Sequence, residues 1–215
     1  MIKRFRDQKI TFLDIGAFYG FFSSLIGTMN PENHVYAFEP NPLNYRALEK
    51  NWKMNCRHGG CFPIALSDSE GTIPFKDRSM KVSASETTMR VPAMRYDEWQ
   101  KENPIKPDLI KLDVHGSEGM VLFGMQDLLI EGGFDLYFEV HSEEMLTKYS
   151  LKEIITLLYD CGWEMSELPD FRDSGASDPV PINPERRSML EDPLKWTQKE
   201  IACERMFFCS KSRCS

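Results

Sequence analysis

Several features that would assign a protein to a class at once are missing from this 215-residue chain. No apolar run approaches the roughly 20 residues that a membrane-spanning helix needs. The first residues carry positive charges but not the apolar segment of a secretory signal. None of the six cysteines forms a C-x-x-C pair, so the spacing of a zinc site is absent and reduced thiols are expected. We therefore expect a cytoplasmic protein with no membrane partner.

An excess of basic residues is missing as well. The chain has 26 lysines and arginines against 33 acidic residues, which gives a net charge of -7. A nucleic-acid partner would favour a basic face, so the charge argues against one. The length suits one domain with a single core, which we assign to residues 1–215. The oligomeric state is not predicted.

The strongest positive signal is a pair of short apolar runs that each end in an acid. The first, in ITFLDIGAFYGFF (residues 10–22), ends in Asp14 and turns at Gly16, and the second, in VYAFEP (residues 35–40), ends in Glu39. Strand, glycine turn, helix, strand and acid are the layout of a nucleoside-cofactor site. The spacing is G-x-x-x-G rather than the dinucleotide G-x-G-x-x-G. An acid before the first glycine favours a cation over a phosphate, so S-adenosylmethionine suits this loop.

Each part of this motif has a predicted role in holding the cofactor. Glycines allow a close backbone approach that a side chain would block, and the Glu39 carboxylate can accept both ribose hydroxyls. The plainer alternatives are a simple strand-to-helix turn and a loop acid, with Asn41 acting as a helix cap. The expected cofactor contacts of this region are Asp14, Gly16, Ala17, Phe18, Gly20, Glu39, Pro40 and Asn41.

Apolar runs alternate with helical patterns along the chain. This alternation predicts an α/β fold with a Rossmann-like doubly wound sheet, mostly parallel with an antiparallel last strand, and helices on both faces. The expected strands are residues 10–14, 35–38, 62–65, 109–114, 134–140, 163–168 and 205–209, with a short extra strand at 72–75. One helix is expected from Ser117 to Gly132. Residues 76–91 are predicted to be a mobile loop over the site, and residues 169–200 a polar C-terminal insert.

Acids and histidines follow two neighbouring strands of this predicted sheet. Asp113 and His115 follow one strand, and Glu139 and His141 end the next, so all four should meet at the carboxyl edge. A histidine there could act as the general base that deprotonates an acceptor hydroxyl. The same groups could instead bind one divalent ion. We predict the metal-free route, because the residues show no spacing specific to an ion.

With these residues in view, the chain resembles the FkbM-type methyltransferases, a branch of the Rossmann-like S-adenosylmethionine-dependent enzymes. Five blocks within residues 11–141 carry the likeness: FLDIGAFYGFFS, VYAFEPNPLNYRALEKN, ALSDSEGTIPF, DLIKLDVHGSEGMVLFGM and LYFEVH. The resemblance implies methyl transfer to an oxygen of a small-molecule or sugar hydroxyl. It also implies an adenine corner made by Leu66, Ser67 and Asp68. His115 departs from the family, which usually has an acid at this position.

Two other functions remain open from the sequence. A nicotinamide-dependent oxidoreductase could use the same fold, although the glycine spacing and the lack of a phosphate cradle count against it. A non-catalytic module that binds the cofactor or a partner is the other alternative, because His115 replaces the usual acid.

Overall fold

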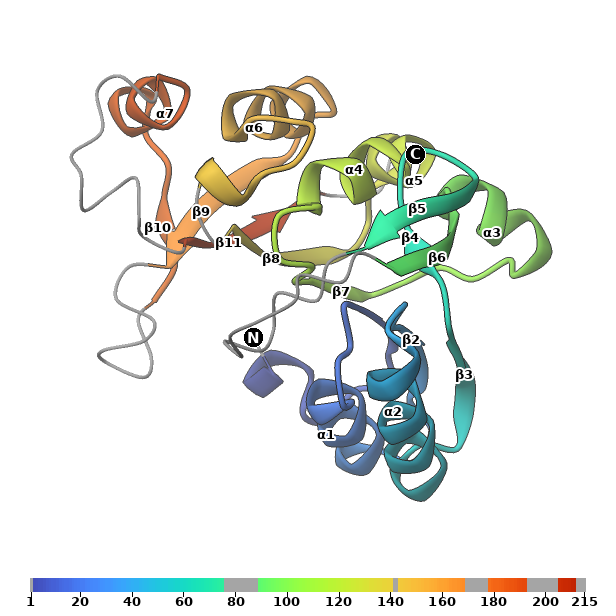
Figure 1. Ribbon diagram of the computed structural model, residues 1–215. Coiled ribbons are helices and arrows are strands. Elements are labelled where there is room, and N and C mark those ends of the chain that lie inside the picture. Colours follow the sequence, from blue (N-terminus) through green and yellow to red (C-terminus); the bar gives the residue numbers. More distant parts are fainter. Residues whose placement is uncertain (1, 76–88, 141–142, 169–177, 193–204, 212–215) are drawn as a thin grey trace.

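The chain forms a large sheet with helices on both sides (Figure 1). The computed structural model describes residues 2–75, 89–140, 143–168, 178–192 and 205–211. The strands are β1 (Thr11–Ile15), β2 (His34–Phe38), β3 (His58–Phe62), β4 (Ala65–Leu66), β5 (Gly71–Phe75), β6 (Met89–Met94), β7 (Leu109–Leu112), β8 (Asp135–Val140), β9 (Glu164–Leu168), β10 (Val180–Pro181) and β11 (Arg205–Ser210). The α-helices are α1 (Phe21–Met29), α2 (Pro42–Asn55), α3 (Tyr96–Glu102), α4 (Glu118–Phe123), α5 (Gln126–Glu131), α6 (Leu151–Asp160) and α7 (Pro184–Leu190), and short 3-10 helices cover Ile2–Phe5 and Glu143–Met145.

The main sheet has the strand order β10-β9-β11-β8-β7-β1-β2-β3. The pairs β1–β2, β1–β7, β2–β3 and β7–β8 are parallel, and β11 is antiparallel to both β8 and β9. The predicted doubly wound sheet with an antiparallel last strand is therefore confirmed. Because β1 lies between β2 and β7, the loops after these three strands meet at one edge, where ligands bind in such sheets.

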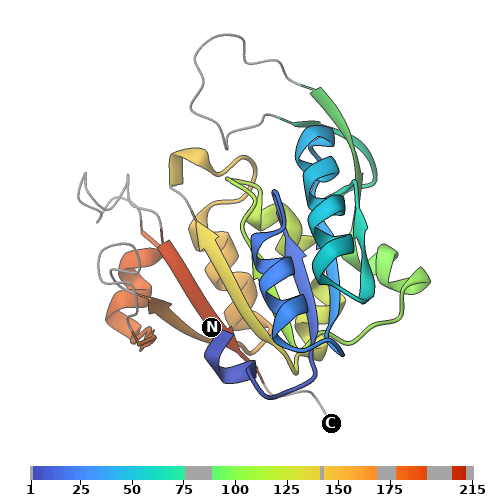
Figure 2. The same cartoon turned by 90° about the horizontal axis from the view of Figure 1, so that it is seen from below.

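Helices cover both faces of the sheet (Figures 1 and 2), and apolar side chains form a core on each face. On one face, α1 packs on β1, β2 and β7 through buried residues that include Ile26, and α2 adds Leu48 beside it. On the other face, α3 to α6 cover the sheet with residues such as Trp99, Leu129 and Ile154. Successive side chains of β1 point to opposite faces of the sheet, so Phe12 lies in one core and Leu13 in the other. A central strand is therefore apolar on both sides.

The third strand of the main sheet differs from its prediction. It was expected at residues 62–65, but β3 covers His58–Phe62 and includes Gly59 and Gly60. Glycine is depleted in strands, so the sequence pattern did not indicate a strand at these residues. Its parallel pairing with β2 holds it in place. Ala65 instead begins β4, which joins β5 and β6 in a separate three-stranded sheet.

Three other predictions need correction. The single helix expected from Ser117 is broken at Gly124 into α4 and α5. In the loop predicted at 76–91, the last three residues belong to β6, and residues 76–88 lie outside the described part. The described part of the insert predicted at 169–200 contains β10 and α7, and Leu190 is fully buried in the main core. The described part of this polar stretch thus contributes Leu190 to the core, and Ile182 packs against it. Among the described helices, none is both long and apolar enough to span a membrane.

Two adjacent residues of α5 test how the helix packs. Leu129 is fully buried and Ile130 is 57% exposed. Leu129→Ala should lower the free energy of unfolding by about 2–5 kcal/mol, because it leaves a cavity in the core. Ile130→Ala should change it by less than about 0.5 kcal/mol. Urea denaturation of both variants measures the difference, and equal losses would contradict this orientation of α5.

Candidate active site

A cavity of about 430 Å³ opens at the carboxyl edge of β1, β2 and β7. The walls are mostly apolar, and a few charged groups lie among them. Of the residues predicted for the site, the following line the cavity: Gly16, Ala17, Phe18, Glu39, Pro40, Leu66, Ser67, Asp113 and His115. This volume falls within the range of small-molecule sites, about 300–1,000 Å³. The cavity lies where the glycine loop and two strand ends meet, and the roles of these residues in binding and catalysis remain predictions.

The glycine loop begins where β1 passes close to the end of β7. Gly16 has a φ of 76°, and a Cβ at this position would overlap the backbone carbonyl of Asp113. Phe18 also has a left-handed backbone, with a φ of 52°. Gly20, with a φ of 81°, precedes α1 and does not line the cavity. The turn thus brings the backbone of residue 16 close to the backbone of Asp113, and only a glycine can occupy this position.

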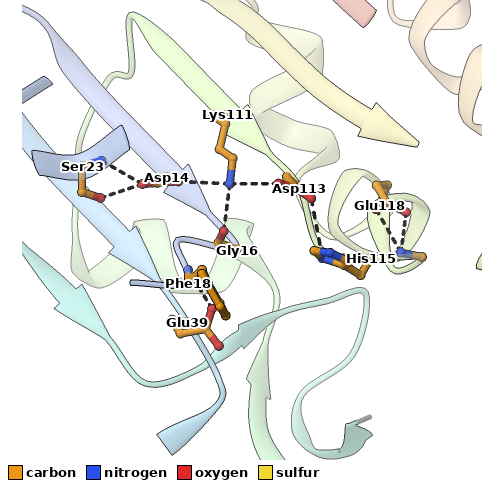
Figure 3. Close-up of polar contacts among 10 residues, drawn as sticks. Asp14, Gly16, Phe18, Ser23, Glu39, Lys111, Asp113, His115 and Glu118 are labelled. Atoms are coloured by element: carbon orange, nitrogen blue, oxygen red, sulfur yellow. Dashed lines mark hydrogen bonds and ion pairs between the residues drawn. The ribbon is translucent and has the colours of Figure 1, made fainter. Parts of the chain in front are cut away.

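Asp14 is fully buried beneath this loop and does not line the cavity. Its Oδ2 accepts hydrogen bonds from the backbone N–H of Ser23 at 3.1 Å and from the Ser23 hydroxyl at 2.7 Å. Ser23 is in the first turn of α1, where a negative charge is favourable. Its Oδ1 lies 3.5 Å from Nζ of Lys111 (Figure 3). The observed contacts of Asp14 thus join β1 to α1 and β7, and direct contact with a cofactor remains a prediction.

Glu39 follows β2 directly and is only 5% exposed, although it lines the cavity. Its Oε2 accepts from the backbone N–H of Phe18 at 2.9 Å, and its Oε1 accepts from that of Asn41 at 2.9 Å. These two bonds tie the glycine loop to the start of α2. Asn41 does not line the cavity. Its side chain caps α2 by accepting a hydrogen bond from the backbone N–H of Leu43, which agrees with the alternative prediction that Asn41 is a helix cap.

The loop after β7 has an unusual backbone. His115 has a φ of 55° and Gly116 one of 103°. Such strained positions cluster at functional sites. Nδ1 of His115 lies 3.6 Å from Oδ1 of Asp113 (Figure 3), so the two residues that line the cavity here are close enough to interact electrostatically. Thr147 stabilises the turn, because its N–H and hydroxyl both donate to the carbonyl of Gly116.

Glu118 lies at the start of α4, just behind this turn. Both of its carboxylate oxygens are 3.0 Å from the backbone N–H of Gly116, and the residue is fully buried. Burial raises the pKa of Glu118 to about 7, although the hydrogen bonds from Gly116 oppose the rise. A carboxyl group that titrates near neutral pH therefore supports the loop that carries His115.

The predicted adenine corner is divided. Leu66 and Ser67 line the cavity, but Asp68 does not. Its Oδ2 accepts from Nζ of Lys148 and from the Tyr149 hydroxyl at 2.6 Å. Burial opposes ionisation of Asp68, but these two bonds outweigh it and lower its pKa. The observed role of Asp68 is to join the loop after β4 to the segment before α6, and its contact with adenine remains a prediction.

Of the second predicted acid–histidine pair, the structure describes only Glu139. Glu139 is buried one residue before the end of β8 and does not line the cavity, and His141 lies outside the described residues. Among the residues that the structure describes, no three or more His, Cys, Asp and Glu side chains form a group that could hold a metal ion. The catalytic roles of Glu139 and His141 are therefore still predictions from the sequence.

Sequence reasoning missed several side chains that line the cavity. The most polar of them is Lys111, within the otherwise apolar run LIKL of β7. A lysine in the middle of a central strand was the available signal, because such strands are nearly continuous hydrophobic runs. The other lining residues that were not among the predicted contacts are Ile15, Tyr19, Phe21, Phe22, Phe38, Asn44, Ile64, Ala65, Ile73, Pro74, Phe75, Val114, Ser117 and Met120.

The chain matches the methyltransferase FkbM domain over residues 14–165 and belongs to this family. It is 29% identical over 137 residues to hexuronic acid methyltransferase AglP of Haloferax volcanii, which covers 60% of this chain and 55% of that protein. The chain thus spans about half the length of this relative.

Two solved structures have a similar fold. Methyltransferase FkbM from Methylobacillus flagellatus is 16% identical, with a TM-score of 0.54, and the match covers 93% of this chain and 43% of that one. Aeropyrum pernix fibrillarin, solved with natively bound S-adenosyl-L-methionine, is 13% identical, with a TM-score of 0.50 and coverage of 95% and 67%. At these identities the likeness shows the fold.

The raised pKa of Glu118 predicts a pH-dependent stability. The folded protein holds this proton more tightly than the unfolded chain, whose glutamate titrates near 4.5, so the stabilisation is present below pH 4.5 and is lost as the pH rises through about 7. Between pH 5.5 and 8, the free energy of unfolding of the wild type should fall by about 1–2 kcal/mol more than that of Glu118→Gln. Urea denaturation at both pH values checks this, and parallel changes in the two proteins would refute it.

Proposed function

We propose that this chain is an S-adenosylmethionine-dependent methyltransferase that acts on an oxygen of a small-molecule or carbohydrate acceptor. The observation that carries the proposal is one cavity lined by the glycine loop, by Glu39 and by the pair Asp113–His115. Family membership supports the reaction type. The name of the relative AglP, a hexuronic acid methyltransferase, supports a sugar acceptor.

The residues of the cavity suit an adenosyl ligand. Glu39 offers a fixed carboxylate for the ribose hydroxyls, and Phe38 and Leu66 give apolar surface for the adenine ring. Gly16 leaves the backbone open where a Cβ could not fit. When bound, S-adenosylmethionine supplies an activated methyl group on a positively charged sulfur. A positive ligand is compatible with the acidic groups at the floor of the cavity.

In catalysis, the residues of this chain would position the acceptor, exclude water and accept one proton. His115 is the candidate base, because imidazole titrates near neutrality and its side chain is 36% exposed at the cavity. Asp113 lies beside its Nδ1 and would stabilise the protonated ring. Alignment of the acceptor oxygen would supply much of the remaining rate.

The Glu39 carboxylate should control cofactor affinity. Glu39→Gln removes the negative charge that would accept the ribose hydroxyls, and it leaves one oxygen in place of the two that accept the backbone N–H groups of Phe18 and Asn41. A hydrogen bond to a charged group contributes about 1.5–3 kcal/mol. Affinity for S-adenosylhomocysteine, measured by calorimetry, should fall at least tenfold. Glu49→Gln, on the exposed side of α2, is the matched control and should bind normally. Unchanged affinity in Glu39→Gln would remove Glu39 from the site.

The pair Asp113–His115 should control turnover. His115→Ala should reduce methyl transfer on the order of a hundredfold, with little change in cofactor affinity, because a general base acts only on the proton transfer. His58→Ala, which changes an exposed histidine at the far end of β2–β3, is the control. Activity should rise with pH through the histidine pKa and persist in chelator. Loss of activity in chelator, with recovery in magnesium or manganese, would indicate metal-assisted catalysis instead.

The assay that tests the whole proposal is transfer of labelled methyl groups to a panel of hexuronic acids, neutral sugars and small phenols. Transfer to one acceptor class supports it. Binding of S-adenosylhomocysteine without transfer to any acceptor would favour a non-catalytic binding module. Binding of a nicotinamide cofactor in its place would favour the oxidoreductase.

A further inference from the structure

Lys111 lies at the floor of the cavity and has no role in the proton transfer described above. It comes from the middle of β7, and its side chain is only 11% exposed. Among the described residues that line the cavity, Lys111 is the one lysine or arginine. A buried ammonium group is costly unless anionic or polar partners surround it, so its position needs an explanation.

The ammonium group has three oxygen neighbours, all from residues at or just after strand ends (Figure 3), and it also lies 5.6 Å from the centre of the Phe22 ring in α1. It donates a hydrogen bond to the carbonyl of Gly16 at 2.8 Å. It lies 3.5 Å from Oδ1 of Asp14 and 3.5 Å from Oδ2 of Asp113. Ordinary N–H···O bonds are 2.7–3.2 Å long. Since an ammonium has three hydrogens and only one is used at that length, it retains donor capacity for an oxygen that enters the cavity.

The charges of this cluster select the kind of ligand. Two carboxylates face one ammonium, so a simple anion such as phosphate would meet repulsion from Asp14 and Asp113. A simple cation would meet repulsion from Lys111. An α-amino acid group carries both a carboxylate and an ammonium on one carbon, and it can satisfy Lys111 and Asp113 together.

We propose that Lys111 binds the carboxylate of the amino-acid end of the methyl donor and that Asp113 receives its ammonium. This assignment rests on the proposed function, because it requires the donor to occupy the cavity. The bond from Lys111 to the Gly16 carbonyl then links recognition of this end to the shape of the glycine loop. Lys111 is thus a specificity residue, which distinguishes the complete donor from adenosine compounds that lack the amino-acid group.

Calorimetry with three ligands tests the assignment. The ligands are S-adenosylhomocysteine, its analogue without the carboxylate (5′-aminopropylthioadenosine), and 5′-methylthioadenosine, which lacks the whole amino-acid group. In the wild type, removal of the carboxylate should weaken binding about 10- to 100-fold, as expected for a charged hydrogen bond. Lys111→Met should weaken binding of S-adenosylhomocysteine by the same factor and leave 5′-methylthioadenosine within twofold.

Two matched variants complete the experiment. Lys111→Arg keeps the positive charge and should retain most of the preference for the carboxylate. Lys106→Met removes an exposed lysine that pairs with Glu131, and it should bind all three ligands as the wild type does. If Lys111→Met does not fold, Lys111→Gln takes its place in the same three-ligand measurement, and equal wild-type affinity for the first two ligands would overturn the assignment without any variant.

The outcomes separate this inference from the proposed function. Equal affinity of the wild type for S-adenosylhomocysteine and the carboxylate-free analogue would overturn the role of Lys111 and leave the proposed function standing. Equal losses for all three ligands in Lys111→Met would do the same, because they would indicate a structural role in the glycine loop. A wild-type protein that binds none of the three ligands would overturn the proposed function and this assignment together.

Discussion

At Gly16 the chain leaves β1 directly against the backbone carbonyl of Asp113, and no side chain fits between the two. This close approach exists because β1 and β7 are parallel neighbours, so their carboxyl ends reach the same edge of the sheet. It also puts the carbonyl of Gly16 within hydrogen-bond distance of Lys111. The shape of the cavity floor therefore depends on the pairing of β1 with β7, and a change that separates these strands also changes the cavity.

The buried carboxyl groups around this floor are each held by specific partners. Asp14 accepts hydrogen bonds from Ser23 in α1, and the Glu39 carboxylate accepts hydrogen bonds from two backbone N–H groups. Glu118 is bonded to the backbone of Gly116. Groups held in this way have fixed positions, and Glu39, which lines the cavity, would present a fixed acceptor to a ligand. The cost of burying them is partly offset by these bonds, which also connect β1, β2 and the loop after β7 to the helices that follow.

The loop after β7 combines strain with a titratable side chain. His115 has a left-handed backbone, and the turn is secured from behind by Glu118 and Thr147. The resemblance to the FkbM-type enzymes leads one to expect an acid at this position. A histidine there substitutes a group that changes charge near neutral pH for one that is usually negative. Its Nδ1 lies 3.6 Å from Oδ1 of Asp113, which is compatible with the proton transfer proposed above.

Local sequence patterns determined the order of the elements, the glycine loop and the acid at the end of β2, because apolar periodicity and helix caps such as Ser150 act over a few residues. They also indicated which strand ends would meet. Only the tertiary structure decided the rest. The glycine-rich β3 is a strand because β2 pairs with it, and Lys111 reaches the cavity because β7 lies beside β1. Asp68 is drawn to Lys148 and Tyr149, far along the chain. Such contacts depend on which strands become neighbours and which loops meet, and that information is distributed over the whole chain rather than held in any one segment.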